Sequence, residues 1–427
     1  MDDNSLFVRF GLHKDRTTLE EAKSLYRGIV VPAHILSYSQ DATVAAVNHI
    51  DHDYYIDPMT YVLTSATIKN YLVEPSADFP DRKVGFKPSI KKMVENYGIY
   101  EHFEESGFKA LTTVDAETLM PRFVENSIKL QLQKIDEGFA AAFKKYSTIL
   151  NLSDHEHNPS FVTAPYFYFD NVQSKQWHDV NLKYARATKA KLEEDGSGLK
   201  VVPILATKTT SLTEQVATDY GDFDEIILWL NDLDESNCKN IPNHVTKLKN
   251  LAKFVKFAST NGLKVSNLYG SYFSILCTKF GLNTISNGIF YGEYKNFKTK
   301  VGGGGPPSRY YINAFHKFYS IPVTILIFQQ HPELFEYEPA STRSYIKDVP
   351  SNIAEFDKKP QLAQIHFLES RKQEFENVSL NSIESLLAEL KATQERYAPL
   401  PDYIIENDTL DHLSAWASAL DSILEEE

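Results

Sequence analysis

The chain has 427 residues, of which 42% are hydrophobic and 24% are charged, a composition typical of a globular protein with a large core. Lys and Arg total 44 against 57 Asp and Glu, and the net charge of −13 argues against unspecific binding to duplex nucleic acid, which depends on cationic contacts to phosphates. The two cysteines, the lack of a signal-peptide pattern and the lack of a long apolar run predict a cytoplasmic protein without a membrane span, a disulfide framework or structural zinc.

Short apolar runs alternate with segments of helical period as far as about residue 330. This alternation is typical of a parallel sheet built from βα units, and eight such units most simply close into a TIM-like (β/α)8 barrel. One of the nine candidates therefore has to lie outside the ring. The predicted strands are 6–12, 29–36, 54–60, 161–169, 200–207, 225–230, 264–269, 283–291 and 323–328.

Two helical features are predicted outside the barrel. Residues 116–150 carry an apolar stripe typical of a long amphipathic helix, which we interpret as an inserted arm that packs across the outside or reaches a partner. The region 336–427 shows no strand pattern and predicts a C-terminal helical appendage, with helices at 361–375, 379–397 and 411–424. The sequence thus divides into a barrel at 1–335 and a helical region at 336–427.

Carboxylates follow several of the predicted strands. Asp57 ends the third strand, Asp232 and Asp234 follow the sixth, and Glu293 follows the eighth. The carboxyl ends of parallel strands are where such folds assemble active sites, so we predict Asp57, Asp232 and Glu293 as catalytic acid/base groups. The structural alternatives are that Asp57 fixes a turn and that the acids after residue 230 stabilise a helix N-terminus.

The stretch from 283 to 311 concentrates the most unusual local chemistry. Asn287, Gly288 and Tyr291 lie at the exit of the eighth predicted strand and are candidate ligand-binding residues. In the loop that follows, Gly303 and Gly304 belong to a run of four glycines whose amides can hold an anion.

Cations accompany this glycine run. Arg309 can clamp the bound anion, and Lys295, Lys298 and Lys300 add local positive charge. The alternative is a surface hairpin that only turns the chain.

No cofactor or metal is expected. The chain has neither a P-loop motif nor a dinucleotide fingerprint after its first strand. His155 and His157 are possible metal ligands, but they belong to a polar loop, whereas a metal site needs convergent ligands on rigid elements.

Two segments resemble the catalytic strands of tRNA-guanine transglycosylase-type barrels. They are YYIDPMTYVLTSA, which contains Asp57, and ISNGIFYGE, which ends at Glu293. The resemblance implies that Asp57 occupies an acid/base position and that Gly288, Gly292 and Glu293 line a base-recognition pocket. Pro58 and Met59 stand where that family has small residues, and its cysteine-rich zinc site has no counterpart here.

Three functions follow from these features. The first is an enzyme that acts on a nucleobase, nucleotide or other phosphorylated ligand by carboxylate acid/base chemistry. The second is a non-catalytic barrel subunit of a multi-protein complex, such as a bacterial antiphage defence or nucleic-acid-processing assembly, with a protein partner bound through the long helix and the C-terminal helices. The third is a glycoside hydrolase in which Asp232 or Asp234 is paired with Glu293.

Overall fold

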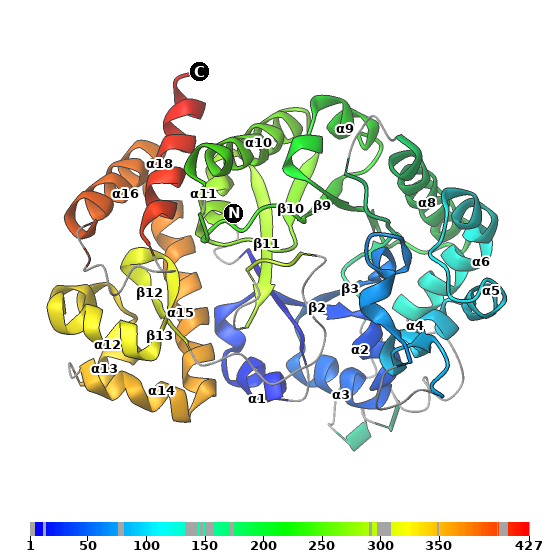
Figure 1. Cartoon of the computed structure of the whole chain (residues 1–427), viewed down its shortest axis with the longest axis horizontal. Helices are drawn as coiled ribbons and strands as arrows, with labels where there is room; N and C mark the ends of the chain where they lie inside the picture. Colours follow the sequence, from blue (N-terminus) through cyan, green and yellow to red (C-terminus); the bar gives the residue numbers. More distant parts are fainter. Residues whose placement is uncertain are drawn as a thin grey trace.

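The structure is a computed structural model of the whole chain (Figure 1). The description below covers residues 5–11, 14–75, 81–132, 144–145, 148–149, 158–170, 175–238, 240–289, 293–296, 309–347, 350–398, 400 and 409–426.

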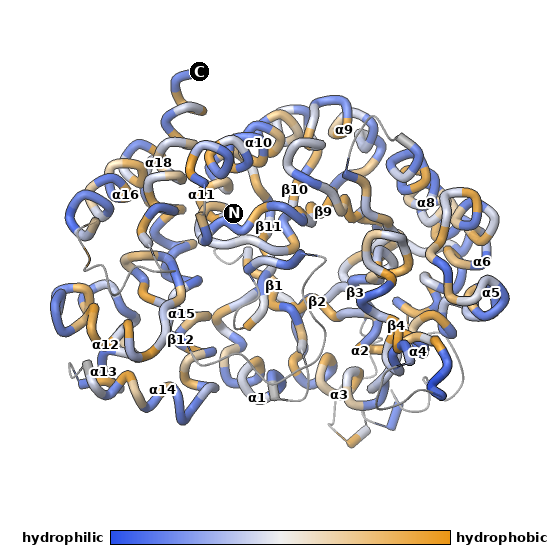
Figure 2. Tube along the Cα trace, in the orientation of Figure 1, coloured by the Kyte–Doolittle hydropathy of each residue, from blue (hydrophilic) through white to orange (hydrophobic). Residues whose placement is uncertain are grey.

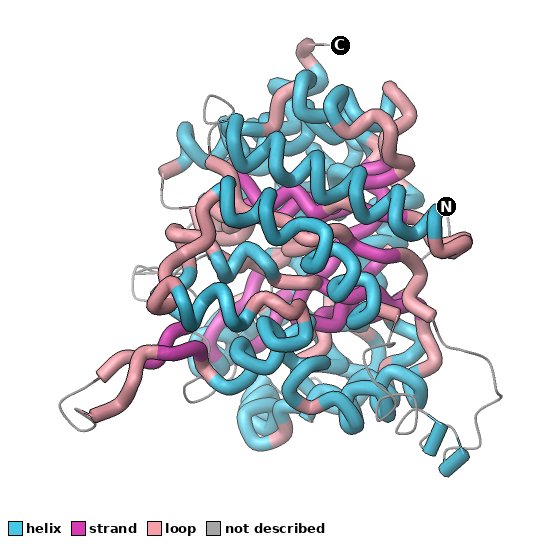
Figure 3. The backbone as a smooth tube through the Cα atoms, turned by 90° about the vertical axis from the view of Figure 1, so that its right-hand side faces the viewer, coloured by secondary structure: helices cyan, strands magenta, loops and turns pink. Residues whose placement is uncertain are grey.

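A seven-stranded parallel sheet forms the centre of the molecule, with the strand order β3-β2-β1-β11-β10-β9-β8. Its strands are almost entirely buried, as expected for apolar runs that helices cover. Figure 2 shows the hydrophobic residues of these strands, and Figure 3 shows the strands enclosed by helices. The strands are β1 (Leu6–Arg9), β2 (Gly28–Pro32), β3 (Asp53–Asp57), β8 (Ile204–Thr207), β9 (Glu225–Leu230), β10 (Lys264–Asn267) and β11 (Leu282–Gly288).

The predicted closed eight-stranded barrel is wrong, because this sheet is curled but open between its edge strands β3 and β8. The segment 158–170 lies between these edges and contains the predicted strand 161–169. Only β6 (Val162–Thr163) is regular in it, paired with β7 (Val201–Val202). Pro165 in the segment and Pro203 between β7 and β8 lack the N–H that a continuous ladder needs.

Isolated hydrogen bonds tie this segment to both edges. The amide of Ser160 donates to the carbonyl of Tyr54 in β3 at 2.8 Å, and the amide of Phe169 donates to the carbonyl of Ala206 in β8 at 3.1 Å. The side chain of Thr163 adds a bond to the carbonyl of Ile56. The gap is therefore spanned by irregular chain rather than by an eighth strand.

Helices connect and cover the strands, as βα units require. The predicted helix 116–150 begins earlier and is shorter than expected. It is α6, and it starts at a capping box in which Thr112 and Asp115 bond each other's backbone amides. The arm beyond residue 132 lies largely outside the described residues. The helices around the sheet are α1 (Lys14–Glu21), α2 (Ala33–Tyr38), α3 (Gln40–Ile50), α4 (Pro88–Asn96), α5 (Tyr100–Glu105), α6 (Thr113–Gln131), α8 (Lys175–Glu194), α9 (Glu214–Asp219), α10 (Ile241–Thr260) and α11 (Tyr272–Leu276).

The C-terminal part is helical, as predicted, and packs against one side of the sheet region (Figure 1). It starts with an antiparallel hairpin, β12 (Arg309–Ile312) and β13 (Lys317–Ser320). The predicted strand 323–328 is instead part of a helix, because Pro322 sits in its first turn and starts α12. The helices are α12 (Ile321–Gln330), α13 (Ala340–Ile346), α14 (Glu355–Lys358), α15 (Pro360–Leu380), α16 (Ile383–Tyr397) and α18 (Asp411–Leu424).

Contacts join the two regions, and the domain boundary at 335/336 stays a prediction. Helix α18 packs on α10, and the indole N–H of Trp416 in α18 donates to the carbonyl of Glu235 at 2.9 Å. In the described part of the chain, no helix is both long and apolar enough to cross a membrane.

Candidate functional site

The strongest candidate site lies at the carboxyl ends of the central strands. Arg9 ends β1 and is half-buried, whereas Asp57 ends β3 and is fully buried. The Oδ1 atom of Asp57 accepts hydrogen bonds from the hydroxyl of Tyr166 at 2.8 Å and from the amide of Met59 at 3.0 Å. Its Oδ2 atom has no partner among the described residues, although the whole residue is 0% exposed. A buried carboxylate oxygen without a donor is costly, so this atom is suited to meet a ligand.

A second cation, which is buried, faces the same place from the segment after β11. The ammonium of Lys295 lies 5.1 Å from the ring centroid of Tyr61 and 5.7 Å from those of Trp229 and Tyr269. The indole N–H of Trp229 donates to the carbonyl of Lys295 at 3.0 Å, which fixes the backbone of this segment. The guanidinium of Arg9 lies 5.5 Å from the ring centroid of Tyr269, which Lys295 also approaches. Both cations are thus held against aromatic faces.

These contacts join opposite halves of the sheet. Tyr61 follows the edge strand β3, and its ring centroid lies 4.2 Å from that of Trp229 in β9. Tyr61 also stacks on Tyr166, at 5.8 Å. The sheet therefore curls around this group of side chains, which we call the interior cluster: Arg9, Asp57, Tyr61, Tyr166, Trp229, Tyr269 and Lys295.

The interior cluster contains two basic side chains and one carboxylate, and their charges act on one another. Burial, followed by the charge of Arg9, lowers the pKa of Lys295 well below its usual value, and Asp57 opposes this only in part. The pKa of His34, at the start of α2, is also lowered. Burial, followed by the charges of Arg9 and Lys295, lowers it to about 3. Within the described residues, the buried Nε of Arg9 and the hydroxyl of Tyr269 lack hydrogen-bond partners. A ligand with negative charge and hydrogen-bond acceptors would balance the basic side chains and would accept from these two groups.

The other predicted catalytic carboxylates have partners of their own. The carboxylate of Asp232 accepts from the amide of Thr209 at 2.8 Å and from its hydroxyl at 2.9 Å, and it lies 3.5 Å from the ammonium of Lys247. Glu293 forms an ion pair with the buried Arg371 of α15. Among the described residues, no contact joins Asp57, Asp232 and Glu293 to one another, so their shared catalytic role stays a prediction.

The predicted ligand-binding residues lie in different places. Asn287 is buried in β11 beside Val8, whereas Gly288 is beside Arg9. Because successive strand residues point to opposite faces, Asn287 lies on the face opposite to Arg9, and Gly288 lies on the same face as Arg9. Arg309 begins β12 and is exposed. Tyr291, Gly303 and Gly304 lie outside the described residues, as do Gly292, Lys298, Lys300, His155 and His157.

Sequence reasoning missed most of the interior cluster. It singled out Asp57 and the positive charge of Lys295, but it passed over Arg9, which is the one charged side chain in β1. A cation at the carboxyl end of a buried apolar strand was the available signal, since such a residue is rarely buried without a partner or a function. The aromatic residues carried no comparable signal.

No metal site accompanies the cluster. The described residues contain no group of three or more His, Cys, Asp and Glu side chains that could hold a metal ion.

No protein-family model matches the chain, and a search of the curated proteins finds no significant match. The resemblance to tRNA-guanine transglycosylase-type barrels therefore stays a prediction, and function has to be argued from the interior cluster.

Proposed function

We propose that the protein is an enzyme that binds a nucleotide, or another phosphorylated ligand with an aromatic ring, at the interior cluster. The observation that supports this most directly is the placing of Arg9 and Lys295 against aromatic rings around one incompletely bonded carboxylate. Two basic side chains, Arg9 and Lys295, outnumber the carboxylate of Asp57, and a bound phosphate would pair with both of them. The faces of Tyr61, Trp229 and Tyr269 are suited to pack against a base, although Lys295 lies among them in this structure.

In this proposal Asp57 is the acid/base group. Its Oδ1 atom is fixed by Tyr166 and Met59, so the carboxylate is oriented while Oδ2 remains for the substrate. The proposal does not require Asp232 or Glu293 in the chemical step, since both are engaged elsewhere. The complex-subunit and glycoside-hydrolase functions stay predictions, because neither gains a supporting contact in the described residues.

Binding is tested by calorimetric titration with the four common nucleoside monophosphates and with inorganic phosphate. At least one of these should bind, and Lys295→Met should weaken that binding by roughly 10- to 100-fold, because hydrogen bonds to charged groups contribute about 1.5–3 kcal/mol. Lys183→Met is the matched control, since Lys183 is exposed in α8 and pairs with Glu117 at the surface. Failure of all five probes to bind, or equal effects of both substitutions, would contradict the proposal.

Turnover is tested separately on whichever probe binds. Asp57→Asn keeps the shape of the side chain and its contact with Tyr166, so binding should change less than fivefold while hydrolysis or base release, followed by chromatography, is lost. A fully active Asp57→Asn protein would exclude the acid/base role.

A further inference from the structure

We propose that the C-terminal region contains a second, separate binding site, which takes a small organic cation carrying a primary ammonium or guanidinium group. The site is a cavity of about 210 Å³ between the turn joining β12 and β13, helix α15 and helix α16. This volume equals the share of roughly seven water molecules in the liquid, which is enough for a small amine or a single side chain. The inference is independent of the function proposed for the interior cluster.

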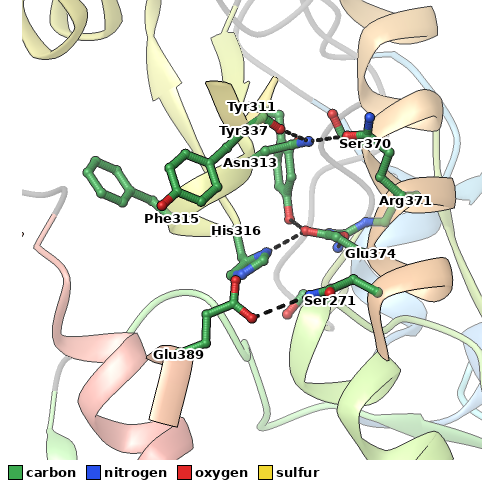
Figure 4. Close-up of polar contacts among 12 residues, drawn as sticks. Ser271, Tyr311, Asn313, Phe315, His316, Tyr337, Ser370, Arg371, Glu374 and Glu389 are labelled. Atoms are coloured by element: carbon green, nitrogen blue, oxygen red, sulfur yellow. Dashed lines mark hydrogen bonds and ion pairs between the residues drawn. The ribbon is translucent and has the colours of Figure 1, made fainter. Parts of the chain in front are cut away.

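The floor of the cavity is a buried carboxylate whose partners hold it in place (Figure 4). Glu374 accepts from the hydroxyl of Tyr311 at 2.7 Å, and it pairs with Arg371 and with Nδ1 of His316, the latter at 2.6 Å. Burial alone would raise the pKa of Glu374, but Arg371 and His316 outweigh it and hold the pKa below its usual value. Glu374 is therefore charged, and His316 donates its Nδ1 proton to it.

The imidazole of His316 is held between Glu374 and Tyr272 at the wall of the cavity. Its backbone is left-handed, with φ 52°, which costs of order 1–3 kcal/mol for a residue other than glycine. The ring stacks on Tyr272 with centroids 3.4 Å apart and planes 5° apart. His316 therefore lines the cavity while its Nδ1 atom is engaged by Glu374.

The remaining wall supplies acceptors and negative charge. Asn313 is 6% exposed, and its amide nitrogen donates to the carbonyl of Tyr337 and to the side chain of Gln373, but its Oδ1 has no partner in the described chain. Glu389 of α16 is exposed at the rim, where its carboxylate lies 3.4 Å from the amide of Asn377. Among the described residues, no Lys or Arg lines the cavity.

The chemistry of this lining selects the ligand class. The oxygen of Asn313 and the carboxylates of Glu374 and Glu389 are acceptors, so the complementary ligand is a donor with several N–H groups and a positive charge. Ammonium and guanidinium groups meet both conditions. Phosphate and carboxylate ligands meet neither.

The test is calorimetric titration of the full chain with agmatine, which carries both groups, and with acetate and phosphate as anionic probes. Agmatine should bind with 1:1 stoichiometry. Glu389→Gln should weaken it by about three- to fivefold, as expected for a solvent-exposed charge pair. Glu395→Gln removes an exposed carboxylate elsewhere on α16 and should leave the affinity unchanged.

A second variant tests the cavity itself. Thr393→Phe places a large side chain in the lining and should weaken agmatine binding more than tenfold, with an unchanged thermal melting temperature to show that the protein is folded. Absence of agmatine binding, tighter binding of an anionic probe that Thr393→Phe abolishes, equal effects of Glu389→Gln and Glu395→Gln, or normal binding by a folded Thr393→Phe protein would each overturn the proposal.

Discussion

The protein contains two buried charged groups that differ in how completely they are paired. In the C-terminal region, Glu374 is bonded by Arg371, His316 and Tyr311, and Arg371 also pairs with Glu293. In the interior cluster, by contrast, Oδ2 of Asp57 has no partner among the described residues. A carboxylate with both oxygens bonded, such as Glu374, suits a structural network, whereas an unbonded buried carboxylate oxygen is expected where a ligand completes the site.

A single short segment connects the two groups. Glu293 reaches Arg371 in α15, whereas Lys295 lies in the interior cluster. Between them, the hydroxyl of Tyr294 donates to the carbonyl of Asn231 at 2.9 Å. The position of Lys295 therefore depends on the structural ion pair next to it, and a change at Arg371 should affect both groups.

The largest expected effect comes from breaking the paired network. Arg371→Met leaves the carboxylates of Glu374 and Glu293 without their cation, so the free energy of unfolding should fall by about 3–5 kcal/mol. Urea unfolding followed by circular dichroism measures this. Arg396→Met is the control, because the ion pair of Arg396 with Glu333 is exposed and should contribute less than about 1 kcal/mol.

A buried carboxylate held mainly by neutral donors should behave differently from Glu374. Burial raises the pKa of Glu338 to about 8, although it accepts from the hydroxyl of Tyr310 and the amide of Asn313. The folded state then keeps a proton that the unfolded state loses near its ordinary pKa of 4.5, so the contribution of Glu338 to stability falls as pH rises from about 4.5 to about 8.

The substitution Glu338→Gln removes this dependence. Relative to the unchanged protein, the variant should gain on the order of 2–4 kcal/mol between about pH 5 and pH 8. Measuring the difference between the two proteins cancels the titration of groups that they share. A difference that does not vary with pH would show that Glu338 is ionised in the folded state throughout.

Removing a cation from the interior cluster should raise the free energy of unfolding, whereas removing Arg371 should lower it. Lys295→Met removes a buried ammonium that lies among rings, so the free energy of unfolding should rise by about 1–2 kcal/mol while nucleotide binding weakens by roughly 10- to 100-fold. Urea unfolding measures the first effect. A loss of stability comparable to that of Arg371→Met would place Lys295 with the structural network.

The smallest effect is expected at Asp232. Thr209→Val removes the hydroxyl that donates to Asp232 but keeps the backbone amide bond, so the loss should be about 1 kcal/mol. The same unfolding measurement applies. A loss of activity without a loss of stability would instead support the catalytic role predicted for Asp232.

The sequence predicts most of the parallel strands because they are buried apolar runs. The run 225–230 coincides with β9, and the predicted strands 54–60 and 283–291 overlap β3 and β11. The run 323–328 is equally apolar but helical, since short apolar runs do not distinguish the two states. Whether the sheet closes into a barrel could not be predicted from the sequence. Hydrogen bonding around Pro165 and Pro203 depends on how the edge strands β3 and β8 meet.

The candidate site is harder to predict than the strands. Asp57 could be proposed because its position at a strand end is visible in the sequence. The contact between Tyr61 and Trp229 depends on how far the sheet curls, and the pair Glu293–Arg371 depends on where α15 docks. Neither quantity is encoded in local periodicity.

The strand order has a consequence for how the chain folds during synthesis. Strand β1 lies between β2 and β11, and residue Val8 pairs with Asn287. The centre of the sheet therefore cannot close until most of the chain has left the ribosome, and until then β1 presents an unpaired apolar edge. Pairing over such a long sequence separation is slow and favours association between nascent chains, so this protein should depend on chaperones more strongly than one whose neighbouring strands follow each other in sequence.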